Sequence, residues 1–269
     1  MDEPGTGFPG EERLLALTKT PDEIEQIRAS SQVVYHVQSA VSERIRPGTT
    51  TRELDALAEQ VIRDHGAAPA FKGYRGFPAS ICASVNEEVV HGIPGGRALR
   101  EGDIISVDVG VWLDGFYGDG AFTVGVGPVN GRCQHLIEAT RGCLERAIDQ
   151  ARPGRRLSDI SHAIEAYAHT QHVAVVRQFG GHGIGRALHE EPHINNYGAP
   201  GRGMRLVPGL VFAIEPILCL GTAEIEVRDD GWTTVTQDGG PAAHWEHTVA
   251  ITADGPQILT LPAAAQTVP

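Results

Sequence analysis

Apolar residues in the first part of the chain recur with the spacing of a helix. From Ile24 to Val41 they stand three, four or seven positions apart, which is the period of one helix face. The preceding residues, Thr20-Pro21-Asp22-Glu23, supply an N-cap, a proline at the first helical position and a capping-box glutamate. A second capping box lies at residues 50–53. We predict helices that start after these two caps, and two further helices at about 131–151 and 157–171.

Runs in which apolar residues alternate with small or polar ones occupy much of the remaining chain. In residues 104–111 the valines alternate with Ser106, Asp108 and Gly110, so Asp108 shares one strand face with small residues. We predict strands at about 81–85, 103–113, 116–126, 210–219, 232–236 and 244–252, and loops at 180–185 and 195–198.

These apolar runs contain or adjoin acidic side chains, although acids are rare in such places. Asp108 and Asp119 flank an Asp-Gly turn signal at 114–115, so a hairpin would bring them together on adjacent strands. Burial of an unpaired carboxylate costs on the order of several kcal/mol, and too few cations lie nearby in the sequence, so metal coordination is expected. The side chains in or beside these runs that could donate an oxygen or nitrogen to a metal ion are Asp108, Asp119, His182, Glu215 and Glu246. This set indicates a two-metal hydrolase.

A weak internal repeat relates the two halves of the chain. Arg46-Pro47-Gly48 aligns with Arg152-Pro153-Gly154, each between two predicted helices. At nearly the same offset Asp108 aligns with Glu215, so two of the strand acids are equivalent. The repeat predicts an α+β half that is duplicated about a pseudo-two-fold axis, with a ligand site between the halves. The alternative is chance similarity between amphipathic segments.

One metal-binding motif in the sequence lacks its structural context. His189-Glu190-Glu191-Pro192-His193 satisfies the pattern His-Glu-x-x-His, which on a helix places two histidines around zinc. Pro192 would remove a helix hydrogen bond at a cost of roughly 3 kcal/mol, and it disfavours helix in the residue before it. We therefore reject a zinc-binding helix in this segment.

Composition and charge narrow the class of protein. The chain has 269 residues, 41% hydrophobic and 21% charged, which is typical of a folded globular protein. Its net charge of -12 argues against tight nucleic-acid binding, and we expect no direct contact with nucleic acid. No run approaches the roughly 18 apolar residues of a spanning helix, and acids stand where a signal peptide has basic residues, so we expect no membrane association.

The cysteines and the chain ends complete this outline. Cys82, Cys133, Cys143 and Cys219 form no Cys-x-x-Cys pair, which suits a reducing cytoplasm. Both ends of the chain lack core-forming residues and periodicity. We predict an N-terminal tail at 1–18, one catalytic domain at 19–260 and a C-terminal tail at 261–269, and we expect a monomer.

Five ordered sequence blocks resemble the signature blocks of type I methionine aminopeptidases. They are Asn86–Pro94, Asp108 with Asp119, the run from Gly181 through Pro192, Ile214-Glu215-Pro216 and Glu246-His247-Thr248. The resemblance covers about residues 20–253 and fills all five metal-ligand positions. It implies the pita-bread fold, an α+β architecture of two pseudo-symmetric halves with an inner antiparallel β-sheet and outer helices. No long helical insertion separates His182 from Glu246, which favours type I over type II.

The resemblance also implies roles for the polar residues. The five donors Asp108, Asp119, His182, Glu215 and Glu246 would bind two divalent metal ions, with Asp119 and Glu246 bridging them. Oxygen donors with one imidazole suit Mn, Fe, Co or Zn, and the sequence does not choose among these metals. Glu215 would move a proton from water to the leaving amine. His91 and His189 would act on the substrate outside the metal shell, although His91 without the resemblance would be interpreted as a turn histidine.

The implied methionine pocket follows the family pattern in part. Tyr74, Phe77, Cys82 and Trp232 stand where the family lines this pocket, and an apolar, polarisable lining suits a thioether. Two positions depart from the pattern: Leu188 stands where phenylalanine is expected, and Phe71 where cysteine is common. This exchange moves aromatic bulk from one wall to another and leaves the substrate preference open. By pattern alone the aromatic residues would be assigned to the core.

The implied function is hydrolytic removal of the initiator methionine, with a preference for a small second residue. The implied partners are the N-termini of nascent polypeptides, which the protein would meet at the ribosome in the cytoplasm. One alternative is an aminopeptidase P or prolidase-like enzyme of the same fold, which usually has an extra N-terminal domain that we do not expect here. A non-catalytic binding protein of the same fold is the other alternative, and the intact ligand set argues against it.

Overall fold

The helices begin where the capping signals predict. The computed structural model describes residues 16–262, and in it helix α2 spans Pro21–Arg44 and helix α3 spans Thr51–Asp64. Thr20 and Thr50 each form a reciprocal capping box with the glutamate three residues later, which satisfies backbone N–H groups that the helix leaves unpaired. Helices α4 (Gly131–Gln150) and α5 (Leu157–Thr170) lie within one residue of the predicted ranges. These helix predictions are confirmed.

Strands fill most of the chain between the helices. They are β1 (Ala68–Pro69), β2 (Cys82–Val85), β3 (Glu88–Val90), β4 (Ile104–Leu113), β5 (Phe116–Gly125), β6 (Ala174–Val175), β7 (Gly180–Gly183), β8 (Glu190–Asn195), β9 (Val211–Ile214), β10 (Ile217–Cys219), β11 (Ile225–Val227), β12 (Thr234–Thr236), β13 (Ala242–His244), β14 (His247–Thr252) and β15 (Gly255–Ile258). Every strand pair within residues 16–262 is antiparallel. The predicted α+β class with antiparallel sheets is confirmed.

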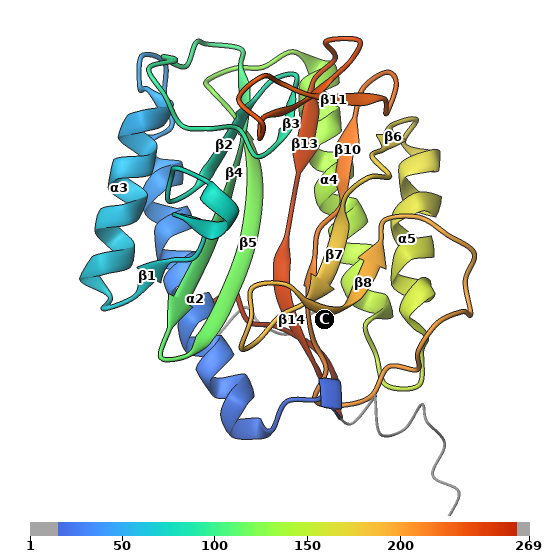
Figure 1. The fold of residues 1–269 in the computed structure, drawn as a ribbon. Helices are drawn as coiled ribbons and strands as arrows, with labels where there is room; N and C mark the ends of the chain where they lie inside the picture. Colours follow the sequence, from blue (N-terminus) through green and yellow to red (C-terminus); the bar gives the residue numbers. More distant parts are fainter. Residues whose placement is uncertain (1–15, 263–269) are drawn as a thin grey trace, which may run out of the picture.

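The helices lie on the outside of the molecule and the strands lie between them (Figure 1). Helices α2 and α3 cover the side formed by β1, β4 and β2, with β5 paired to β4. Helices α4 and α5 cover the other side, where the sheets β13-β10-β6 and β15-β14-β9-β7-β8 lie. Each side has its own buried apolar cluster, and Trp245 packs against both clusters. The interior between the two helix pairs is therefore where the two sides meet.

The structure repeats its backbone features at the spacing of the sequence repeat. Gly48 and Gly154 follow their helices with φ of 90° and 88°, and Gly102 and Gly209 precede equivalent strands with φ of 92° and 96°. The short strand β1 pairs with β4 in the first half, and β6 pairs with β10 in the same way in the second half. The predicted duplication is confirmed, because chance similarity of sequence would not reproduce these backbone angles and strand pairings.

One loop prediction and two strand predictions need correction. The loop predicted at 180–185 is wrong for residues 180–183, which form β7 between β8 and β9. Glycines predict a strand poorly, but at Gly181 and Gly183 a side chain would collide with backbone of the neighbouring strands, so the close packing requires glycine. The strand predicted at 210–219 is interrupted after Ile214, and the one predicted at 244–252 is interrupted after His244. The loop prediction at 195–198 holds after Asn195, where β8 ends.

The segment with the His-Glu-x-x-His pattern adopts an extended conformation. Glu190 to His193 belong to β8, so the two histidines do not lie on one helix face. The rejection of a zinc-binding helix is confirmed. Among residues 16–262 no helix has the length and apolar character needed to cross a membrane.

The predicted tails fall mainly on residues outside the described range. Residues 1–15 and 263–269 lie beyond it, so the boundaries at 18 and 261 remain predictions. Leu17 and Leu261, near the inner ends of the predicted tails, are partly buried against the core cluster of the second half.

Candidate active site

An unbroken hairpin holds the two aspartates of the first half. Strands β4 and β5 pair along their full length, with Gly110 opposite Asp119 and Asp108 opposite Ala121. Because alternate residues of a strand share one face, Asp108 and Asp119 lie diagonally on the same face. The Asp119 backbone N–H donates to the Thr248 hydroxyl at 3.1 Å, which in turn donates to the Asp119 carbonyl at 2.8 Å. The predicted hairpin is confirmed, and it is joined to β14 beside Asp119.

The two glutamates of the second half lie where strands are interrupted. Glu215 separates β9 from β10, because Pro216 has no N–H to continue the ladder. Glu246 separates β13 from β14, and its backbone pairs instead with Ala121 of β5. The two hydrogen bonds of this pair measure 2.9 Å and 3.3 Å. The interruption therefore attaches Glu246 directly to the hairpin of the first half.

His182 reaches the same place from β7. Its Nδ1–H donates to the carbonyl of Gly183 at 2.9 Å, so the lone pair of the neutral ring is on Nε2. This Nε2 lies 3.6 Å from Oε1 of Glu215, and the residue is 6% exposed. Burial lowers the pKa of His182 to about 3, so the imidazole is neutral near pH 7. A neutral ring with an oriented Nε2 is the form in which histidine binds metals.

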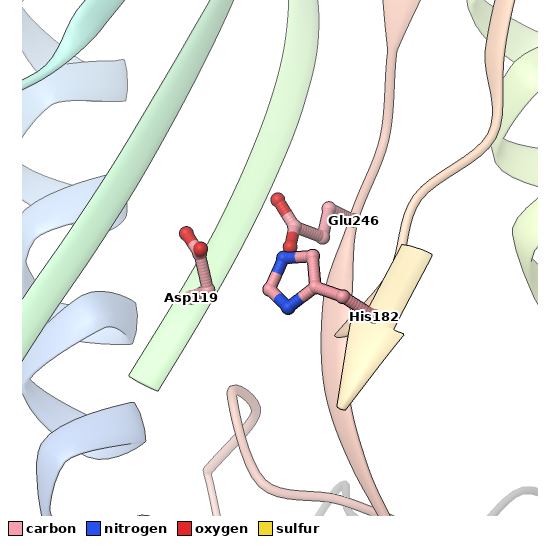
Figure 2. A group of neighbouring side chains, drawn as sticks. All are labelled: Asp119, His182 and Glu246. Atoms are coloured by element: carbon pink, nitrogen blue, oxygen red, sulfur yellow. The ribbon is translucent and has the colours of Figure 1, made fainter. Parts of the chain in front are cut away.

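Three of the five donors converge closely. One ligand atom from each of Asp119, His182 and Glu246 lies within 4.8 Å of the other two. Figure 2 shows Asp119 on β5, with Glu246 and His182 reaching toward it from the other side. The two halves thus contribute to one cluster, as the repeat predicts.

Burial raises the pKa of all four carboxyl groups in the predicted donor set. It raises the pKa of Asp108 to about 7, and it raises those of Asp119, Glu215 and Glu246 well above the ordinary range. Neighbouring carboxylates add to the shift for Asp119, Glu215 and Glu246, because like charges at short range in a dry site oppose one another. Ionisation of all four groups at neutral pH therefore requires positive charge among them.

The residues present fit a centre of divalent metal ions. Asp108 Oδ1 and Glu246 Oε1 are buried and have no hydrogen-bond partner in the described part of the chain. Such oxygen atoms are costly to bury unless they meet a donor or a cation. Several carboxylate oxygens with one neutral imidazole are donors that Mn, Fe, Co and Zn accept.

A cavity of about 170 Å³ adjoins the cluster. Its lining includes all thirteen residues to which the sequence assigned a role: Phe71, Tyr74, Phe77, Cys82, His91, Asp108, Asp119, His182, Leu188, His189, Glu215, Trp232 and Glu246. Phe71 and Leu188, the two departures from the family pattern, are 9% and 2% exposed and belong to one apolar cluster. The structure brings these residues together, while their individual roles stay predictions.

His189 lies between a predicted metal ligand, His182, and an aromatic residue of the cavity lining, Tyr74. Its Nδ1 is 3.0 Å from the hydroxyl of Tyr74, and the two rings stack with centroids 5.4 Å apart. On its other side the ring centroid is 4.3 Å from that of His182. Burial lowers the pKa of His189, and the positive charge of Arg75 lowers it further. A neutral His189 has one nitrogen that accepts and one that donates a hydrogen bond.

His91 lines the cavity next to Trp232. Its ring packs edge-on against Phe179 and Trp232, with centroid distances of 5.4 Å and 6.1 Å. Its φ of 59° is left-handed, which is uncommon for residues other than glycine and is concentrated at functional sites. Burial lowers the pKa of His91 to about 4. An ordinary turn histidine would be exposed to solvent, whereas the His91 ring packs against two aromatic rings and lines the cavity.

Two residues beside these donors, Arg75 and His244, have no role predicted from the sequence. Arg75 lines the cavity within a 3-10 turn, and its guanidinium carbon lies 5.4 Å from the Tyr74 ring centroid. His244 ends β13, is 3% exposed, and places Nε2 3.7 Å from Oε2 of Glu215. A signal for His244 exists, since it stands two residues before Glu246 in an otherwise apolar run. An arginine in a glycine-rich turn carries no comparable signal.

Comparison with known proteins identifies relatives over nearly the whole chain. The model of metallopeptidase family M24 matches residues 25–253. Methionine aminopeptidase 1 of Bacillus subtilis is 48% identical over 246 residues, which cover 91% of this chain and 99% of the relative. Methionine aminopeptidase 1 of Mycobacterium tuberculosis is 48% identical over 250 residues, covering 90% of this chain and 94% of the relative.

Solved structures give the same result for the fold. Methionine aminopeptidase from Thermotoga maritima matches with a TM-score of 0.90 and 44% identity, covering 91% of this chain and 99% of that chain. Prolidase from Pyrococcus furiosus matches with a TM-score of 0.74 and 24% identity, covering 94% of this chain and 67% of that chain. At this lower identity the second likeness shows a shared fold alone.

Proposed function

Because the chain belongs to metallopeptidase family M24, we propose that it is a methionine aminopeptidase that removes the initiator methionine from nascent proteins. The observation that carries this proposal is the convergence of four carboxyl groups and His182 beside an apolar cavity. The names of relatives that align over nearly their full length support the same substrate.

We propose that the five donors hold two divalent metal ions, with Asp119 and Glu246 shared between them. Support comes from the buried, unpartnered oxygens of Asp108 and Glu246 and from Nε2 of His182, which carries no hydrogen in the neutral ring. When bound, such ions act as Lewis acids toward the scissile carbonyl and lower the pKa of water. The choice among Mn, Fe, Co and Zn belongs to experiment.

Glu215 is proposed as the residue that moves the proton. It lines the cavity, and its side chain is 14% exposed, so it can meet a water molecule from the solvent side. Its Oε1 and Oε2 can take a proton from the attacking water and deliver it to the leaving amine. Geometry supports this role because Glu215 lines the cavity and lies 3.6 Å from Nε2 of His182, a proposed metal ligand.

His91 and His189 are proposed to bind the substrate. Both rings line the cavity, and burial favours their neutral forms, which both donate and accept hydrogen bonds. The hydrogen bond between the Tyr74 hydroxyl and Nδ1 of His189 holds His189 in its orientation. We propose that these histidines position the scissile carbonyl, which increases the rate because the reacting atoms start near their reacting geometry.

The apolar wall is proposed to hold the methionine side chain. Phe71, Phe77, Cys82 and Leu188 are buried in this wall, with Tyr74 and Trp232 beside them. The cavity of about 170 Å³ is smaller than the roughly 300–1,000 Å³ of sites for larger ligands, which supports the binding of one side chain. We further propose that the protein acts as a monomer on nascent N-termini at the ribosome in the cytoplasm.

The test is release of free methionine by the full-length protein after removal of metal with a chelator. Mn, Fe, Co or Zn is added back, and the substrates are Met-Gly-Met-Met and a Met-Pro peptide. Release from the first peptide that depends on added metal is the expected result. Methionine release by the chelator-treated protein before any metal is added would contradict metal dependence. Cleavage of the Met-Pro peptide alone would indicate an aminopeptidase P activity.

A further inference from the structure

His244 lies beside the two glutamates of the cluster, and no step described above uses it. Its Nε2 is 3.7 Å from Oε2 of Glu215 and 3.9 Å from Oε2 of Glu246. This nitrogen is fully buried and has no hydrogen-bond partner among residues 16–262. A buried N–H group without a partner costs roughly 1–3 kcal/mol, so an imidazole in this position needs a function or a compensating contact.

The backbone of His244 is held from both halves of the molecule. Its N–H donates to the Thr123 hydroxyl of β5 at 2.9 Å, and that hydroxyl donates to the His244 carbonyl at 2.7 Å. Within its own half, His244 pairs with Ile217 of β10. These contacts fix the backbone that carries the ring, and His244 is 3% exposed, so little space is left for the side chain to turn away from the glutamates.

Glu215 is flanked by one histidine on each oxygen. His182 Nε2 lies 3.6 Å from Oε1, and His244 Nε2 lies 3.7 Å from Oε2. His182 uses its Nδ1–H for the Gly183 carbonyl, so its Nε2 carries no hydrogen in the neutral ring. His244 is therefore the neighbour that can donate a hydrogen bond to Glu215. A distance of 3.7 Å exceeds a usual N–H···O contact of about 2.9 Å by an amount that a small rotation of the carboxylate closes.

We propose that His244 is a positioning residue that donates its Nε2–H to the carboxylates of Glu215 and Glu246 and fixes their orientation toward the metal ions. This proposal rests on the proposed function, since it takes both glutamates as metal ligands. Residues that hydrogen-bond to metal ligands orient them, and their loss lowers metal affinity by roughly 10–100-fold. The effect on metal binding is thus measurable without any turnover.

The test is a titration of the chelator-treated full-length protein with Co(II), followed by visible absorption and by calorimetry. His244→Leu removes the donor and keeps an apolar side chain, and it should raise the dissociation constant roughly tenfold or more. His244→Gln restores a side-chain N–H donor and should recover most of the affinity. Trp245→Phe is the matched control, because Trp245 Nε1 is also buried without a hydrogen-bond partner in the described part of the chain. This substitution should leave the affinity for Co(II) unchanged.

Several results would overturn the proposal. Co(II) binding by His244→Leu that equals the wild type would remove His244 from the metal site. Equal weakening in the Leu and Gln variants, with unchanged melting of the metal-free proteins, would make the imidazole a direct ligand instead of a positioning residue. If the Leu variant does not fold, His244→Met takes its place, and failure of both to fold would show a purely structural role.

Failure of the proposed function gives a different pattern. In that case the wild-type protein itself would bind no Co(II) and release no methionine. Failure of the His244 proposal alone would leave wild-type binding and turnover intact while the Leu variant matched them.

Discussion

The two halves of the molecule carry equivalent acids on strands of different kinds. Asp108 lies within β4, which pairs with β5 without interruption, whereas its equivalent Glu215 lies at the gap between β9 and β10. An uninterrupted ladder uses every backbone group and directs side chains by alternation alone. An interrupted strand leaves backbone groups available, and those of Glu246 pair with Ala121 in the other half. The second half therefore supplies two predicted metal ligands, Glu215 and Glu246, and through the backbone of Glu246 it also forms hydrogen bonds to the first half.

This difference shows how a duplicated half can keep an acid and change its setting. In the first half the position of the carboxylate follows from strand register. In the second half the position of the Glu215 carboxylate follows from the strand break at Pro216, and that of Glu246 follows from its backbone hydrogen bonds to Ala121 of the first half. The two settings should respond differently to substitution.

The largest expected effect is on turnover, when the equivalent acids are neutralised. Asp108→Asn should bring methionine release from Met-Gly-Met-Met below detection, because one cation loses a charged donor. Glu215→Gln should lower kcat by roughly 10²–10⁴-fold, because it also removes the proposed proton carrier. Release assays at saturating metal measure both effects.

Asp114→Asn is the matched control for this pair. Asp114 is exposed at the turn of the same hairpin and has φ of 48°, which asparagine also tolerates. It should retain full activity. Turnover at the wild-type level in Asp108→Asn or in Glu215→Gln would remove that residue from the proposed site.

The next effect is on stability in the presence of a chelator. Burial and neighbouring carboxylates raise the pKa of Asp119, so above the unfolded value of about 3.9 the unfolded chain binds fewer protons than the folded one. That group therefore lowers the free energy of unfolding as pH rises. Asp119→Asn should be more stable than the wild type at pH 7.5, on the order of a few kcal/mol, and the advantage should shrink toward pH 4.

Urea denaturation of both proteins at several pH values measures this difference. The buried histidines have lowered pKa values and give the opposite slope, but they are present in both proteins and cancel in the comparison. An advantage of Asp119→Asn that stays constant with pH would show that folding does not raise the pKa of Asp119. Glu246→Gln should behave in the same way in the second half.

A smaller effect separates two equivalent glycines. Gly102 and Gly209 both have left-handed φ, so alanine at either should cost about 1 kcal/mol in backbone strain. A side chain at Gly102 would meet no atom within 4 Å, whereas one at Gly209 would lie 3.0 Å from the Lys19 carbonyl oxygen. Gly209→Ala should therefore destabilise the protein more than Gly102→Ala in urea denaturation. Equal losses would mean that Lys19 moves away without cost.

The smallest effect concerns a hydrogen bond that joins the halves at the cavity. Tyr74→Phe removes the hydroxyl that lies 3.0 Å from Nδ1 of His189. One such hydrogen bond contributes about 0.5–1.5 kcal/mol, so kcat/KM should fall roughly two- to tenfold with little change in stability. Tyr117→Phe, on β5 outside the cavity lining, is the control and should not change kcat/KM. An unchanged kcat/KM in Tyr74→Phe would show that His189 keeps its orientation without this contact.

Local signals predicted the elements that depend on neighbours in the sequence. The capping residues Thr20 and Thr50 mark the helix starts because their side chains bond to N–H groups three residues away. The hairpin at Asp108 and Asp119 follows from alternation and one turn. Strand β7 was not predicted because glycine has a low preference for strands. Its glycines are required only because the neighbouring strands pack closely against them.

The sequence by itself determined which donors are present and where helices α2, α3, α4 and α5 lie, because these follow from residue type and short-range spacing, and it indicated the duplication through the similarity of its two halves. Only the tertiary structure decided that Glu246 leaves its strand to pair with β5, that His244 comes to lie beside Glu215, and that Phe71 and Leu188 share one wall. The physical reason is that these contacts join segments far apart in the chain. Their free energy depends on packing between the halves, which no local pattern encodes.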